Sequence, residues 1–298
     1  MMEPNTNDEL IHQLESSGRF RILRKLDTPH AYNKPDGSKK KLGAFLDLET
    51  TGLNYLSAEI IEIALVPFRY SSDGRIFEVL EPFNQLQQPK KGLIPEEITK
   101  ITGITNEMVN GQEIDVARLK EIVSQSSIIV AHNANFDRRF AEAEFDFFAT
   151  KPWACSMSQI PWRDEGLEGG KLEYLAMKSG FYYDAHRAST DCYAGIELLT
   201  KNLQKSNKLT FNVLLEEARK ETRRIWAERA PFDLKDILKE RGYHWNDGSD
   251  GHPKAWHRDV PEGELDSEIS FLRQEIYLRD VDLPISTITA WDRFSNRA

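Results

Sequence analysis

Four acidic side chains and one histidine stand in short motifs that are far apart along the chain. Asp47 and Glu49 lie two residues apart at the end of an apolar run, so strand periodicity places both carboxylates on one face. Asp137 falls in the first turn of a predicted helix, and His186 precedes Asp191 by five residues near the start of another. Each motif alone also fits an ordinary surface acid, because acids are common at strand ends and helix starts. Together the motifs predict a carboxylate cluster with a histidine beside it.

Such a cluster has a definite chemistry. Carboxylate oxygens are hard ligands that suit Mg²⁺ or Mn²⁺ rather than zinc. Two divalent ions about 3.5–4 Å apart would stabilise the attacking and leaving oxygens of a phosphodiester. His186 would take the proton of the attacking water, because histidine titrates near neutral pH. A further acid, Glu62, stands inside the apolar run 60–64.

The charge balance agrees with this interpretation once metals are counted. The 298-residue chain has a net charge of −9, and residues 43–205 hold sixteen Lys and Arg against twenty-four Asp and Glu, a net charge of −8. An acidic segment repels nucleic-acid phosphates unless bound cations change the local sign. A solvated acidic surface is the alternative explanation.

Composition excludes several other classes of protein. Hydrophobic residues make up 40% of the chain and charged residues 29%, as in an ordinary soluble globular protein. The two cysteines, Cys155 and Cys192, form neither a disulfide framework nor a cysteine zinc site, which predicts a reduced, cytoplasmic protein. The polar N-terminus and the short apolar runs predict no signal peptide and no membrane contact.

The elements that must position these residues alternate between strands and helices. Strands are predicted at 44–48, 60–68, 76–83 and 128–131, and helices at 95–101, 116–123, 136–147, 172–179 and 186–203. This order is typical of an α/β domain built around a mixed sheet.

The flanking segments have their own patterns, which divide the chain into an N-terminal accessory arm and linker (1–42), an α/β domain (43–205) and a small C-terminal α+β module (206–298). The arm has a short helix at 8–15 and alternating apolar residues at 20–26. The module has an amphipathic helix at 211–230, a helix at 234–240, a hairpin joining 243–245 to 255–258, and a helix from residue 261.

Two features of the module leave alternatives open. Four basic residues form a stripe on the predicted helix, which is either a track for nucleic-acid phosphates or a solvated face: Arg219, Lys220, Arg223 and Arg224. Three aromatic residues either stack on unpaired bases or form the core of the hairpin: Tyr243, Trp245 and Trp256.

The order of the motifs is similar to that of a known family. Asp-x-Glu at 47–49, Asn-x-x-Phe-Asp at 133–137 and His-x-x-x-x-Asp at 186–191 resemble the DnaQ-like (DEDDh) 3′–5′ exonuclease superfamily. The segments 45–53, 60–64, 94–96 and 102–105 also resemble family segments, and the match covers roughly residues 42–203. The resemblance implies an RNase H-like mixed sheet flanked by helices.

The resemblance also implies a role for each matching residue. Asp47, Glu49 and Asp191 would bind the first of two divalent cations, and Asp47 would bridge to the second, which Asp137 supports. His186 would be the general base. The remaining positions would contact substrate: Thr51, Gly52 and Leu53 at the 3′-terminal nucleotide, Asn133 and Phe136 in shaping the pocket, and Glu62, which is otherwise a structural acid.

These roles predict a metal-dependent 3′–5′ exonuclease of the proofreading or repair type, resembling the epsilon proofreading subunits of bacterial DNA polymerase III. Its expected partner is nucleic acid with a free 3′ end, with DNA favoured over RNA, and a DNA polymerase or replication complex is a further candidate. The alternatives are an RNA 3′-trimming exonuclease of the same superfamily and an interaction module of a replication complex. The sequence does not distinguish DNA from RNA, because that choice depends on contacts near the ribose 2′-hydroxyl.

Overall fold

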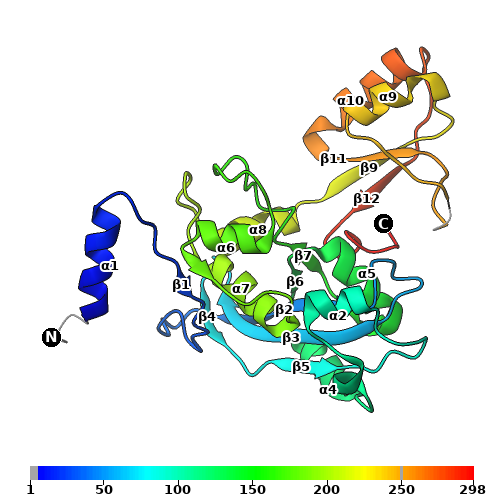
Figure 1. The fold of residues 1–298 in the computed structure, drawn as a ribbon. Helices are drawn as coiled ribbons and strands as arrows, with labels where there is room; N and C mark the ends of the chain where they lie inside the picture. The colour runs from blue at the N-terminus through cyan, green and yellow to red at the C-terminus, as the bar shows by residue number, and fades with distance from the viewer. Residues whose placement is uncertain (1–5, 249–250) are drawn as a thin grey trace.

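The centre of the fold is a six-stranded mixed sheet (Figure 1). The structure is a computed structural model that describes residues 6–248 and 251–298. The strands are β2 (Lys40–Thr50), β3 (Ile60–Ser71), β4 (Ile76–Val79), β5 (Phe83–Leu86), β6 (Ile129–Ala131) and β7 (Trp153–Cys155). Their order is β4-β3-β2-β6-β7, with β5 also paired to β3. β2 runs antiparallel to β3 and parallel to β6, so the sheet is mixed.

Helices cover both faces of this sheet. One face packs against α6 (Leu172–Lys178), α7 (Ala188–Thr200) and α8 (Thr210–Arg219). The other packs against α4 (Val116–Gln125), α5 (Ala134–Glu144) and the 3₁₀ helix Asp146–Thr150. Two short helices, α2 (Glu96–Thr102) and α3 (Asn106–Val109), enclose a small separate cluster. The predicted fold class, an α/β RNase H-like mixed sheet flanked by helices, is confirmed.

Strand β2 shows how the sequence orients the acidic pair. Phe45 belongs to the cluster under α7, whereas Leu46 and Leu48 belong to the cluster on the opposite face. Side chains alternate along a strand, so Asp47 points to the same face as Phe45. A Cβ on Gly195 of α7 would lie 2.2 Å from the Phe45 ring, so only glycine lets this helix approach β2 so closely.

Two predicted elements are wrong. The predicted strand 76–83 is divided into β4 and β5, with Pro82 between them. The predicted helix 211–230 ends at Arg219, and Thr222–Ala227 forms strand β9, paired with β11 and β12. The basic stripe therefore does not exist as one helical face. Arg223 and Arg224 lie on β9, where they form ion pairs with Glu262 and Asp259.

The C-terminal module is a second, four-stranded sheet with its own core. Its strands β9, β10 (His244–Trp245), β11 (Trp256–Pro261) and β12 (Ile285–Ile288) stand in the order β10-β11-β9-β12, and the predicted hairpin is confirmed. Its helical segments are Phe232–Leu234, α9 (Lys235–Glu240), Glu262–Glu264, α10 (Leu265–Phe271) and the π-helix Leu272–Ile276. Tyr243 and Trp256 lie in the core, as one of the two interpretations expected, while Trp245 is half exposed.

Segments on both sides of the central domain contact it. Helix α1 (Thr6–Ser16) stands apart in Figure 1, but β1 (Arg24–Lys25) pairs in parallel with β8 (Phe181–Tyr182). The C-terminus lies beside α5, and α8 shares the hydrophobic cluster of α7. The division of the chain at residues 42 and 205 stays a prediction, and these contacts cross both boundaries. Within the described residues, no helix is both long and apolar enough to cross a membrane.

Candidate active site

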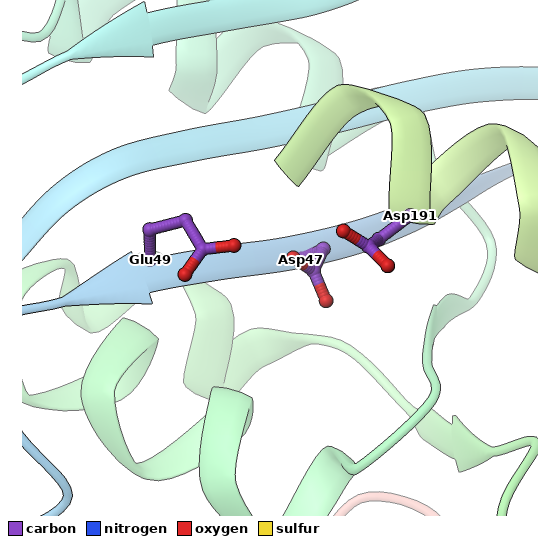
Figure 2. A group of neighbouring side chains, drawn as sticks. All are labelled: Asp47, Glu49 and Asp191. Atoms are coloured by element: carbon purple, nitrogen blue, oxygen red, sulfur yellow. The ribbon is translucent and has the colours of Figure 1, made fainter. Parts of the chain in front are cut away.

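Three of the predicted acids meet above the central sheet. Asp47 and Glu49 project from β2 and Asp191 from α7 (Figure 2), and one carboxylate oxygen of each lies within 4.8 Å of the others. Asp191 is one helical turn before Gly195, so the close approach of α7 to β2 also brings Asp191 to the strand.

Asp137 approaches the same place from the opposite face of the sheet. It lies in the first turn of α5 and is 3% exposed. Among the described residues, it is not one of the three whose oxygens lie within 4.8 Å of one another. Its charge nevertheless helps to raise the pKa of Asp47, second only to burial. The four predicted acids therefore share one electrostatic environment.

The negative charges of these acids destabilise one another. Burial, followed by repulsion from the neighbouring acids, raises the pKa of Asp47 well above its usual range. Burial and the charge of Asp191 raise the pKa of Glu49 to about 8. Burial also raises the pKa of Asp137 and Asp191. Carboxylate oxygens that are partly buried, as in Asp47, Glu49 and Asp191, and whose charges repel one another are the donor set that a divalent cation fits.

The loop before α7 orients Asp191 through both carboxylate oxygens. Tyr183 donates its hydroxyl to Oδ1 at 3.0 Å, and the backbone N–H of Arg187 donates to Oδ2 at 3.2 Å. His186 lies in this loop, exposed to solvent, with a left-handed backbone φ of 65°. Its positive charge also lowers the pKa of Asp191. The structure thus places the predicted base next to the predicted ligands.

Glu62 is completely buried behind this loop. Its carboxylate accepts hydrogen bonds from the guanidinium of Arg187 at 2.9 and 3.2 Å, from the Ala188 backbone N–H at 3.2 Å and from Asn84 at 3.2 Å. The structural role that the sequence left open for Glu62 is therefore visible: it anchors the start of α7. Sequence reasoning missed Tyr183 and Arg187, since neither belongs to the acidic and histidine motifs.

The predicted nucleotide contacts border a cavity of about 300 Å³. Thr51, Gly52 and Leu53 line one side of it, and the segment 89–95 supplies part of the rest. Leu53 is 87% exposed, as expected for a side chain that would wedge against a base. Among the described residues that line this cavity, neither Asn133 nor Phe136 is found. Both lie at the start of α5, within four residues of Asp137.

Residues 44–199 match the RNase_T family, which is described as an exonuclease family. The chain belongs to this exonuclease family. The match covers more than half of the chain and contains all five predicted catalytic positions.

Named relatives agree with the RNase_T assignment. The chain is 33% identical over 167 residues to DNA polymerase III subunit epsilon of Treponema pallidum, covering 52% of this chain and 73% of that protein. It is 32% identical over 185 residues to the PolC-type DNA polymerase III of Clostridium perfringens, covering 60% of this chain but only 12% of that protein. The resemblance to DnaQ-like, epsilon-type exonucleases is confirmed.

Solved structures of two exonucleases were also similar. Exonuclease X in complex with 5′ overhanging duplex DNA is 24% identical, with a TM-score of 0.39, covering 59% of this chain and 90% of that chain. A structure of exonuclease I is 18% identical, with a TM-score of 0.49, covering 84% of this chain and 63% of that chain.

Proposed function

We propose that this RNase_T family member is a divalent-metal-dependent exonuclease that removes nucleoside monophosphates from the 3′ end of DNA. The observation that carries the proposal is the meeting of Asp47, Glu49 and Asp191 within 4.8 Å of one another. A cluster of carboxylates has little use without a cation, because its charges repel each other and the phosphates of a nucleic acid alike.

Mg²⁺ or Mn²⁺ would occupy this site, held first by Asp47, Glu49 and Asp191. Asp47 and Asp137 would hold a second ion. The cations would stabilise the charge that develops on the attacking and leaving oxygens of the scissile phosphate. The oxygen donors and their raised pKa values fit such ions, whereas zinc sites favour nitrogen and sulfur ligands.

The remaining steps belong to the protein's own side chains. His186 would accept the proton of the attacking water, and its exposed position leaves the imidazole accessible to that water. Thr51, Gly52 and Leu53 would hold the 3′-terminal nucleotide in the cavity that they line, with Leu53 against its base. Asn133 and Phe136 would complete the pocket from the α5 side.

DNA is proposed as the substrate because the named relatives are DNA polymerase III proteins. The same relatives support a DNA polymerase as a partner, in a proofreading or repair role. RNA trimming would use the same chemistry and differ only in contacts near the 2′-hydroxyl. A protein serving only as an interaction module would bind nucleic acid or a polymerase without turnover.

The proposal is tested with 5′-labelled DNA and RNA oligonucleotides of one sequence, single and double stranded, incubated with Mn²⁺. We expect faster shortening of DNA than of RNA by the wild type. Asp47→Asn should reduce the rate by at least about 10³-fold, since it removes a ligand oxygen worth several kcal/mol of transition-state stabilisation. The exposed Asp233→Asn is the matched control and should behave as wild type. Faster shortening of RNA than of DNA would identify RNA as the substrate. Binding of the oligonucleotides without hydrolysis would refute the proposed enzymatic activity.

A further inference from the structure

The loop 183–187 is held in an unfavourable conformation. His186 has a backbone φ of 65°, a left-handed geometry that costs free energy for any residue other than glycine. Such a conformation persists only where neighbouring contacts determine it. The contacts that fix this loop therefore also fix the proposed base and the nearby Asp191.

Tyr183 supplies the most direct of these contacts. Its hydroxyl donates to Oδ1 of Asp191 at 3.0 Å, and its ring packs against the hydrophobic cluster under α7. The packing of the ring therefore holds the hydroxyl in place, and the hydroxyl orients the Asp191 carboxylate. Partners that hydrogen-bond to a ligand carboxylate fix its direction toward a cation.

Tyr183 is in turn placed by a segment outside the RNase_T match. The N-terminal strand β1 pairs with β8, which ends at Tyr182. The backbone N–H of Arg24 donates to Gly180 O at 3.1 Å, and that of Leu26 donates to Tyr182 O at 2.8 Å. The Lys25 ammonium lies 2.8 Å from the Asp184 carboxylate, one residue beyond Tyr183. The arm therefore holds the chain on both sides of Tyr183.

We propose that Tyr183 is a positioning residue for Asp191 and that strand β1 of the N-terminal arm keeps Tyr183 in place. This inference rests on the proposed function only in assigning Asp191 to a metal site. It gives residues 24–26 an indirect role in catalysis. These residues pair with β8, this pairing holds the loop 183–187 in place, and the loop orients the proposed metal ligand Asp191. Neither the arm nor Tyr183 contacts substrate in this account.

The first test replaces Tyr183→Phe, which keeps the ring and removes the hydroxyl. The matched control is Tyr182→Phe, at the preceding and half-exposed position. Mn²⁺ binding is followed by electron paramagnetic resonance of the free ion, without substrate. We expect Tyr183→Phe to weaken Mn²⁺ binding about 10-fold, the lower end of the range for such partners. The control should bind as wild type, and both variants should melt near the wild-type temperature in EDTA.

The second test addresses the arm. Arg24→Pro removes the N–H that bonds to Gly180, while Arg24→Ala removes the same exposed side chain and keeps that N–H. We expect Arg24→Pro to speed hydrogen exchange in residues 181–187 and to weaken Mn²⁺ binding about 3- to 10-fold, the equivalent of one hydrogen bond. Arg24→Ala should change neither.

Wild-type Mn²⁺ affinity in Tyr183→Phe would overturn the role of Tyr183. Unchanged exchange and affinity in Arg24→Pro would overturn the role of the arm. Because these measurements need no hydrolysis, a wild type that binds Mn²⁺ but does not shorten DNA would refute the proposed function alone. A wild type that binds no Mn²⁺ would refute both.

Discussion

The C-terminal residues 289–298 should stabilise the domain that carries the active site, because they supply most of the acceptors of a buried arginine. Arg138 follows Asp137 on α5 and is completely buried. Its guanidinium donates to the carbonyls of Ala290 at 3.2 Å, Trp291 at 2.6 Å and Arg293 at 2.8 Å. A chain that ends at Ile288 loses all three acceptors and leaves the charge with Glu142, 2.6 Å from Nε.

The cost of this truncation can be bounded. A hydrogen bond to a charged group contributes about 1.5–3 kcal/mol, so three of them set an upper bound of about 9 kcal/mol. Water will enter the uncovered site and replace part of that loss. Removing the partner of a buried charge costs about 3–5 kcal/mol in measured cases, and we expect a value in that range. The free energy of unfolding of a domain is about 5–15 kcal/mol, so the truncated chain should still fold but with markedly reduced stability.

The assay is urea unfolding of four chains: full length and truncated, each with and without Arg138→Met. In the full chain, Arg138→Met removes the hydrogen bonds to all three carbonyls and should destabilise the protein, although Ala290 O still accepts from the Trp153 N–H and Trp291 O from Arg297. In the truncated chain those carbonyls are gone and only the ion pair with Glu142 remains, so Arg138→Met should cost less there than in the full chain. Arg139→Met is the matched control, because its buried Nε has no hydrogen-bond partner within residues 6–248 and 251–298. Truncation costing under about 1 kcal/mol, or Arg138→Met costing the same in both chains, would refute the reasoning.

Three further predictions concern the site itself. Gly195→Ala should cost about 1–3 kcal/mol and reduce activity, because its Cβ would lie 2.2 Å from the Phe45 ring; Gly263→Ala, in open space, should cost little in the same denaturation assay. In EDTA the melting temperature should fall as pH rises from about 5 to 8.5, because the folded protein keeps a proton on Glu49 up to its pKa of about 8 while the unfolded chain loses it near 4.5. Mg²⁺ added at pH 8 should restore the melting temperature, and a flat profile in EDTA would contradict the charge argument. His186→Ala should lower turnover on single-stranded DNA about 10²–10⁴-fold with unchanged Mn²⁺ affinity, whereas lost affinity with retained turnover at saturating metal would give His186 another role.

The acidic site could be predicted because its signal is local. Asp47 and Glu49 share a face for the simple reason that strands alternate, and the apolar residues around them fix which face is buried. That Asp191 meets them could not be worked out from spacing alone, since it depends on Gly195 and the approach of α7. The resemblance to the exonuclease family implies that the three carboxylates meet, and the distances between their oxygens agree.

The errors arose where tertiary pairing overrides local pattern. Ile225 and Trp226 continue the helical spacing of α8, yet both belong to β9, where β11 and β12 supply the hydrogen bonds. β-branched and aromatic residues suit either element, so the neighbouring strands decide. Pro82 was a local signal for the break between β4 and β5 that the apolar run outweighed. The buried position of Arg138 could not be predicted from the sequence, because three of its hydrogen-bond acceptors are backbone carbonyls, which every residue carries.

The polarity and metal dependence of hydrolysis distinguish a metal-dependent 3′–5′ exonuclease from other nucleases. The substrates are one 5′-labelled single strand with a free 3′-hydroxyl, the same strand with a blocked 3′ end, and a circular strand, each with Mg²⁺, Mn²⁺ or EDTA. We predict stepwise release of mononucleotides from the free 3′ end with either cation, protection of the blocked and circular strands, and no reaction in EDTA. Cutting of the circle, or full activity in EDTA, would contradict a metal-dependent 3′–5′ exonuclease.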